Sequence, residues 1–231
     1  MHRSRIPAIL VGGLAVAVAL LGSSGPAEAQ GGTIAGEVKF SGTAPAPKVV
    51  KVNKDVEACG QEKKIAEVAV GAGGGLANAI VSVPGAKGAK PAGKAVLDQK
   101  GCEFRPPVLV MAPGDLEILN SDGVLHNIHT FSTANPAVNK AQPKFKKSMT
   151  EKFAKPEVIK VQCDAHSWML GWLVVTEAPT AVTDDKGSFK LENVPAGKHK
   201  VEVLHPILGK QTKEVEVKAG QETKVSFELK K

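Results

Sequence analysis

The sequence is dominated by short segments in which apolar and polar residues alternate. This pattern is typical of half-buried β-strands, whereas the periodicity of an amphipathic helix is nearly absent. Turn signals such as Pro113-Gly114-Asp115 separate the segments. We therefore predict an all-β chain built from antiparallel sandwiches. The clearest segments are Thr33–Phe40, Asn78–Val83, Val108–Ala112, Leu116–Asn120, Val124–Phe131, Val158–Gln162, Leu170–Thr176, Lys200–Leu204, Lys213–Val217 and Thr223–Leu229.

The composition supports this fold class and excludes others. The chain holds 24 Gly and 15 Pro in 231 residues, without a three-residue period, which excludes a collagen-like or long-helix protein. Hydrophobic residues make up 42% of the sequence, too many for a disordered chain. One or two globular domains are expected from this length.

The first residues have the pattern of an export signal. Arg3 and Arg5 precede an apolar run over residues 8–21, and small residues follow up to Ala29, after which we predict cleavage. A retained anchor is the alternative, but the 14-residue run is shorter than the roughly 20 residues that span a bilayer. We therefore predict a signal peptide over residues 1–29 and a periplasmic or secreted protein without a transmembrane anchor.

One segment combines three side chains that bind soft metals. Cys163, His166 and Met169 follow one another at C-x-x-H-x-x-M spacing, just before an apolar strand. A second imidazole is available at His126, after a predicted turn. Two His and one Cys with a distant Met are the ligand set of a blue-copper centre. A zinc site on the same residues, or no metal and ordinary packing of these side chains, are the alternatives.

Two other histidines are predicted to lie outside this site. His129 is three residues past His126 and therefore points to the opposite face of the strand. His205 belongs to another part of the chain, and we interpret it as a structural or surface residue.

With these motifs the sequence resembles the cupredoxins, most closely the amicyanin and plastocyanin branch. The resemblance rests on residues 113–122 leading into 126–129, and on residues 163–175. It implies a Greek-key β-sandwich over residues 96–178 that binds one type 1 copper ion. The implied ligands are His126, Cys163 and His166, with Met169 as the weak axial ligand.

The resemblance also assigns roles around the ligands. Asn127 would tie the two ligand loops together and direct its backbone N–H at the Cys163 sulfur. The sequence departs from many members of the branch at Ala165, where they carry Pro. Because Ala165 keeps an N–H, we expect a second hydrogen bond to that sulfur.

Three cysteines in an exported protein leave one that cannot form an internal disulfide. With Cys163 assigned to the metal, we predict that Cys59 pairs with Cys102 in the oxidising compartment. Closing this loop of about 43 residues would stabilise the fold by roughly 4 kcal/mol on the chain-entropy model. Two free thiols are the alternative.

The C-terminal part resembles a second family. Residues 183–201, with turns at Asp185-Lys186-Gly187 and Pro195-Ala196-Gly197, are similar to the carboxypeptidase regulatory-like β-sandwich, a relative of transthyretin in shape. The segments 32–38 and 77–83 look like its first strands. We therefore predict a discontinuous sandwich over residues 30–95 and 179–231, with the cupredoxin inserted. The simpler alternative is a cupredoxin over 31–178 followed by a small β tail.

These observations predict an exported mononuclear blue-copper protein that carries single electrons and is not an enzyme. Without its leader the chain has 28 bases against 22 acids, which favours an acidic redox partner; the compartment argues against nucleic acid. We expect docking near the ligand loop, at Lys144, Lys146 and Lys147, although such a basic run is often only a solvated face. The alternative function is a copper-holding or surface- or carbohydrate-binding module without redox turnover.

Overall fold

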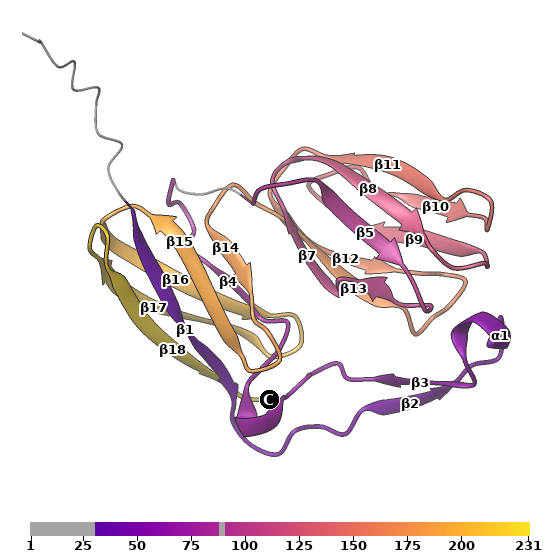
Figure 1. Cartoon of the computed structure of the whole chain (residues 1–231), viewed down its shortest axis with the longest axis horizontal. Coiled ribbons are helices and arrows are strands. Elements are labelled where there is room, and N and C mark those ends of the chain that lie inside the picture. Colours follow the sequence, from indigo (N-terminus) through magenta and orange to yellow (C-terminus); the bar gives the residue numbers. More distant parts are fainter. Residues whose placement is uncertain (1–30, 88–90) are drawn as a thin grey trace, which may run out of the picture.

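A computed structural model describes residues 31–87 and 91–231 of the chain. Two β-sandwiches lie side by side, and a long hairpin extends beneath one of them (Figure 1). The prediction of an all-β fold is confirmed, because every alternating segment named above overlaps a strand. The predicted signal peptide falls outside the described residues. Within the described ranges, no helix has the length and apolar character needed to cross a membrane.

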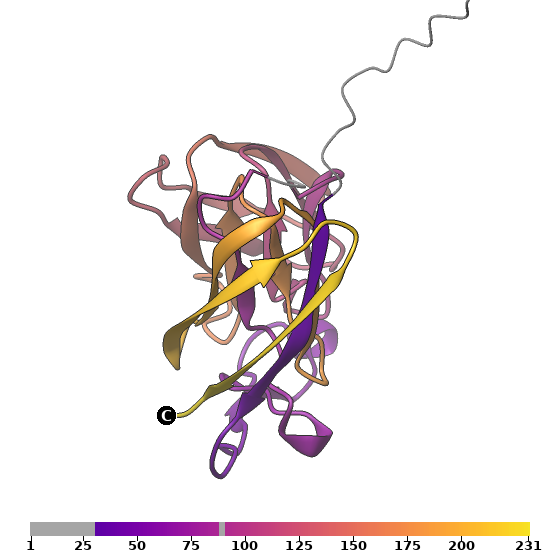
Figure 2. The same cartoon turned by 90° about the vertical axis from the view of Figure 1, so that its left-hand side faces the viewer.

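The terminal sandwich takes strands from both ends of the described chain. Its first sheet has the order β15-β1-β18, in which β1 runs antiparallel to β15 and parallel to β18 (Figure 2). Its second sheet has the order β14-β4-β16-β17. The strands are β1 (Gly32–Phe40), β4 (Ile80–Ser82), β14 (Thr180–Val182), β15 (Ser188–Val194), β16 (Gly197–His205), β17 (Gly209–Val217) and β18 (Glu222–Leu229).

The central sandwich is formed by the chain between β4 and β14. One sheet has the order β10-β9-β12-β13-β7 and the other β11-β8-β5-β6. The strands are β5 (Ala95–Gln99), β6 (Phe104–Arg105), β7 (Val108–Met111), β8 (Gly114–Asn120), β9 (His126–Phe131), β10 (Asn139–Gln142), β11 (Ser148–Phe153), β12 (Glu157–Gln162) and β13 (Leu170–Val175).

Residues 48–65 form a hairpin that belongs to neither sandwich sheet. It consists of β2 (Lys48–Lys51), the single-turn helix α1 (Val56–Cys59) and β3 (Glu62–Ile65). In the part of the chain that the structure describes, its two strands pair only with each other. A short 3-10 helix, η1 (Ala72–Gly74), follows it. Our prediction placed this stretch in the discontinuous sandwich, yet its buried residues Val52 and Cys59 pack in the core of the central sandwich.

Each sandwich has its own apolar core, and a small third cluster joins them. The alternation of β1, with Ile34 and Val38 fully buried, directs one face into the terminal core. Leu116 and Ile118 do the same for β8 in the central core. The third cluster packs Ile80 of β4 against residues of β7 and β13, so the two sandwiches share an apolar contact.

Candidate metal centre

Three ligand atoms converge at one end of the central sandwich. His126 begins β9, Cys163 directly follows β12, and His166 lies in the loop before β13. The Nδ1 atoms of the two histidines are 3.1 Å apart, and the Cys163 Sγ is 3.8 Å from the Nδ1 of His166. All three side chains have 0% exposure, and their ligand atoms lie within 4.8 Å of one another.

The loop from Cys163 to Met169 is closed by its own backbone. The Cys163 N–H donates to the Met169 carbonyl at 3.3 Å, and the Met169 N–H donates to the His166 carbonyl at 2.9 Å. These bonds fold the chain back between β12 and β13, so that residues three apart face one point rather than opposite sides of a strand. Met169 is buried in the same core.

Backbone donors surround the Cys163 sulfur. The N–H of Asn127 donates to Sγ at 3.3 Å, and the Asn127 side chain accepts from the Asp164 N–H at 3.0 Å, which links the two ligand loops. Burial raises the pKa of the Cys163 thiol, while the N–H groups of Asn127, His166 and Ala165 act in the opposite direction. These N–H dipoles all favour negative charge on the sulfur.

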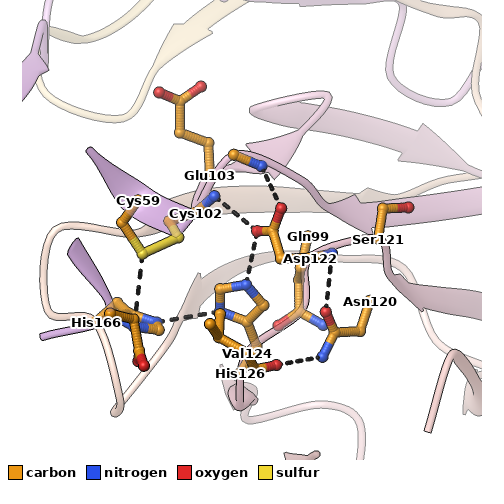
Figure 3. A network of polar contacts seen from close by, with 12 residues as sticks. Cys59, Gln99, Cys102, Glu103, Asn120, Ser121, Asp122, Val124, His126 and His166 are labelled. Carbon is orange, nitrogen blue, oxygen red and sulfur yellow. Dashed lines mark hydrogen bonds and ion pairs between the residues drawn. A yellow bond between two sulfur atoms is a disulfide. The ribbon is translucent and has the colours of Figure 1, made fainter. Parts of the chain in front are cut away.

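A carboxylate holds His126 from outside the site (Figure 3). Asp122 Oδ2 lies 2.8 Å from the His126 Nε2, and the same carboxylate accepts from the backbone N–H groups of Gly101 and Cys102, each at 2.8 Å. Burial alone would raise the Asp122 pKa, but these hydrogen bonds outweigh it and lower the pKa. Burial lowers the His126 pKa, and Asp122 opposes that shift.

A second carboxylate holds His166. Asp55, at the tip of the hairpin, places Oδ2 3.0 Å from the His166 Nε2, although the two residues are 111 positions apart in the sequence. A carboxylate can only accept, so both histidines donate from Nε2 and keep Nδ1 unprotonated when they are neutral. Two lone pairs then face each other across 3.1 Å, an arrangement that is stabilised by a cation between them.

The spacing of the donor atoms fits one metal ion. Protein-bound metals such as zinc lie about 2.0 Å from imidazole nitrogen and about 2.3 Å from thiolate sulfur, so donors on one ion are roughly 3–4 Å apart. The His126–His166 and Cys163–His166 separations of 3.1 and 3.8 Å fall in this range, and all three donor atoms lie within 4.8 Å of one another. Carboxylates behind metal-binding histidines are the usual means by which proteins fix the tautomer and the ring orientation.

The structure contains the disulfide between Cys59 and Cys102, and Cys163 is the free thiol. The Cys59 sulfur is 3.8 Å from the His166 Nε2. On the other side, the Trp168 indole donates to the Cys102 carbonyl at 3.2 Å, and its ring packs against the His166 ring at 5.1 Å between centroids. The disulfide therefore belongs to the wall of the site.

The two histidines that were predicted to lie outside the site do so, and two carboxylates that were not predicted belong to it. The His129 Nδ1 donates to the Asp164 carboxylate at 3.0 Å, and its ring stacks on Phe131, away from the cluster. His205 is buried beside the contact between the sandwiches, and burial lowers its pKa. The sequence reasoning did not find Asp122 and Asp55. Asp122 lies in the turn predicted before His126, four positions ahead of that ligand candidate. For Asp55, the predicted pairing of Cys59 with Cys102 was the only indication that its segment approaches the central sandwich.

Comparison with known families supports the C-terminal resemblance. The family model of the carboxypeptidase regulatory-like domain matches residues 173–230, as predicted for this part of the chain. No curated protein matches the chain.

Structures with a similar fold include members of the other predicted family. An amicyanin mutant with Cu(I) is 18% identical and covers 42% of this chain and 98% of its own, with a TM-score of 0.33. A purple cupredoxin from Nitrosopumilus maritimus is 20% identical, covers 36% and 100%, and has a TM-score of 0.31. A copper-containing nitrite reductase from Thermus scotoductus SA-01 is 24% identical, covers 40% of this chain and only 24% of its own, and has a TM-score of 0.32. At these values the likeness carries no functional conclusion.

Proposed function

We propose that the chain binds one copper ion and carries single electrons. His126, Cys163 and His166 would be the strong ligands and Met169 the weak axial one. The observation that carries the proposal is the fully buried cluster of two imidazole nitrogens and one cysteine sulfur within 4.8 Å of one another, with both outer imidazole nitrogens held by carboxylates.

The donor set favours copper over zinc. In blue-copper sites, copper is bound by one thiolate and two imidazoles with a weak, more distant thioether, and this chain offers those groups. Structural zinc sites instead use four thiolate and imidazole ligands. When bound, copper would supply a one-electron couple between Cu(II) and Cu(I). Zinc binding to the same residues is an outcome that the experiments below distinguish.

The residues of the chain hold the donors in fixed positions. His126 is anchored by β9 and by Asp122, His166 by Asp55, and Cys163 by the N–H of Asn127. Such a rigid set of ligands needs little rearrangement between two oxidation states, and electron transfer requires no general acid, base or nucleophile. We therefore propose a carrier rather than an enzyme.

A redox partner would dock beside the site. Gln142 pairs with His126 in the register of β10 and β9, so the loop over residues 143–147 starts next to this ligand candidate. Phe145 is 81% exposed in the loop, and the Lys147 Nζ is 3.4 Å from the Asp122 carbonyl. An exposed aromatic residue among lysines suits an acidic protein partner. The lysines of the loop are Lys144, Lys146 and Lys147.

The proposal also covers where the protein works and how its chain is divided into domains. We propose that residues 1–29 are removed on export and that the protein works in the periplasm or outside the cell. We propose the same domain boundaries as above: a discontinuous sandwich over residues 30–95 and 179–231, and the inserted cupredoxin over residues 96–178. The hairpin 48–65 extends from the terminal sandwich to the central one. The terminal sandwich would serve as scaffold or as a binding surface.

Voltammetry tests the function. The copper-loaded protein should give a reversible one-electron wave, and Met169→Leu should keep copper but raise the potential, because loss of a weak thioether donor destabilises Cu(II) more than Cu(I). A copper-loaded protein without a reversible wave would support the copper-holding alternative instead. An unchanged potential in Met169→Leu would place the axial donor elsewhere.

A further inference from the structure

Among the described residues, the hairpin 48–65 has no further strand paired with it. Its strands β2 and β3 pair only with each other, and a two-stranded hairpin is marginally stable at best in water. Its position therefore depends on what its tip contacts. The tip is the segment from Val52 to Gln61, which is closed at its base by a hydrogen bond from the Val52 N–H to the Gln61 carbonyl at 2.9 Å.

The tip lies on the outer edge of His166. Asp55 contacts the Nε2 of that ring at 3.0 Å and Cys59 contacts the same atom at 3.8 Å. The His166 side chain has 0% exposure, whereas the Asp55 side chain keeps 27% and faces water on its other side. Without the tip, this edge of the imidazole would lose the two groups that cover it.

Three links anchor the tip and the adjoining strand β3 to the site. The disulfide joins Cys59 to Cys102, whose own N–H donates to Asp122, the carboxylate behind His126 (Figure 3). The Lys63 Nζ donates to the Gly101 carbonyl at 2.5 Å. Val52 and Cys59 are each about 4% exposed and belong to the central core. The same short segment at Gly101 and Cys102 thus holds the tip and one histidine.

We propose that residues 48–65 are a disulfide-anchored cap over the metal centre, and that Asp55 is a positioning residue for His166. Asp55 accepts the Nε2 proton and so keeps the Nδ1 lone pair directed into the site. The cap closes the His166 edge to water and to small ligands, so access along that edge requires the tip to move. The inference rests on the proposed function only in treating His166 as a ligand.

The first test uses the metal-free protein, so it does not depend on copper binding. Diethyl pyrocarbonate acylates accessible imidazole nitrogens, and mass spectrometry measures the rate at each histidine. We expect His166 to react at least tenfold faster in the double variant Cys59→Ser/Cys102→Ser than in the unmodified protein. His199, in the terminal sandwich, is the internal control and should keep its rate. Equal rates at His166 in both proteins would overturn the cap.

The second test concerns Asp55 alone. Heteronuclear NMR of the imidazole nitrogens at neutral pH should show His166 protonated at Nε2 in the unmodified protein and in Asp55→Asn, whose side-chain oxygen can still accept. Asp55→Ala should give a mixture of tautomers. Glu57→Ala, an exposed change on the same hairpin, is the matched control. A single Nε2–H tautomer in Asp55→Ala would overturn the positioning role.

The two proposals fail in different ways. If copper binds without a redox wave, the function proposed above is wrong while the acylation and NMR results stand. If His166 is already acylated quickly in the unmodified, metal-free protein, the cap is wrong whatever the copper chemistry shows.

Discussion

Replacing Asp122 by Asn should break part of the hydrogen-bond network behind His126. The Asp122 Oδ1 accepts from the Gly101 N–H, and its Oδ2 accepts from both the Cys102 N–H and the His126 Nε2. Asp122→Asn turns one of these oxygens into a donor. The amide keeps two bonds if its oxygen takes the Oδ2 position, and its NH₂ group then opposes the Gly101 N–H.

The expected loss of unfolding free energy can be summed over these three hydrogen bonds. Leaving the Gly101 N–H opposed by another donor costs about 1–2 kcal/mol. The bonds to Cys102 and His126 change from charge-assisted to neutral and each lose about 0.5–1 kcal/mol. Only 10% of the Asp122 side chain is exposed, so solvent screens little of this difference. We expect Asp122→Asn to lower the free energy of unfolding by about 3 kcal/mol in the metal-free protein.

The assay is urea unfolding followed by tryptophan fluorescence. Both tryptophans of the chain, Trp168 and Trp172, lie in the central sandwich, so the signal reports the module that contains the site. Asp115→Asn, an exposed change on β8, is the matched control and should stay within about 0.5 kcal/mol of the unmodified protein. If Asp122→Asn unfolds at the same urea concentration as this control, the carboxylate does not hold the two loops.

Three further changes test other parts of the site and its scaffold. Hydrogen bonds from Ser132, Asn135 and nearby backbone N–H groups outweigh burial and hold the Glu157 pKa well below its usual range, so its stabilisation is present above about pH 4 and is lost as the pH falls. Glu157→Gln should therefore destabilise the protein by about 1 kcal/mol at neutral pH, with the difference shrinking in acid; a pH-independent difference would contradict this. Ala165→Pro removes an N–H directed at the Cys163 sulfur. If that bond favours Cu(I) by about 1 kcal/mol, the reduction potential should fall by about 40 mV. A rise or no change by voltammetry would mean that the N–H has no such effect. Neutralising the loop lysines should slow electron exchange with an acidic partner at low salt and not at high salt, and a salt-independent rate would leave them as a solvated face. These lysines are Lys144, Lys146 and Lys147.

Much of the fold could be predicted from local pattern because alternation reports burial directly. In β8 and β9 every second residue is buried, so the sequence shows the strand without any knowledge of its neighbours. Strands such as β2 (Lys-Val-Val-Lys) and β3 (Glu-Lys-Lys-Ile) carry no such signal, because they are mostly exposed on both faces and are held at their tip. The hairpin was therefore missed.

For the site, too, residues that are close in sequence could be predicted and residues that are distant in sequence could not. Cys163, His166 and Met169 are close in sequence, and their spacing alone suggested a metal loop. Asp55 escapes this reasoning because its contact with His166 depends on how a hairpin folds across a different sandwich. Its neighbour Cys59 gave the only indication, since pairing with Cys102 brings this segment to the central sandwich.

The most direct test of the central claim is a titration of the metal-free protein with Cu(II), followed by visible absorption. A Cys thiolate on Cu(II) in this kind of site should give intense colour that saturates at one ion per chain, and dithionite should bleach it. Cys163→Ser should abolish the colour without unfolding the protein, because the sandwich has its own apolar core. Intense colour that persists in Cys163→Ser, or no colour in the copper-loaded unmodified protein, would contradict the proposed copper centre.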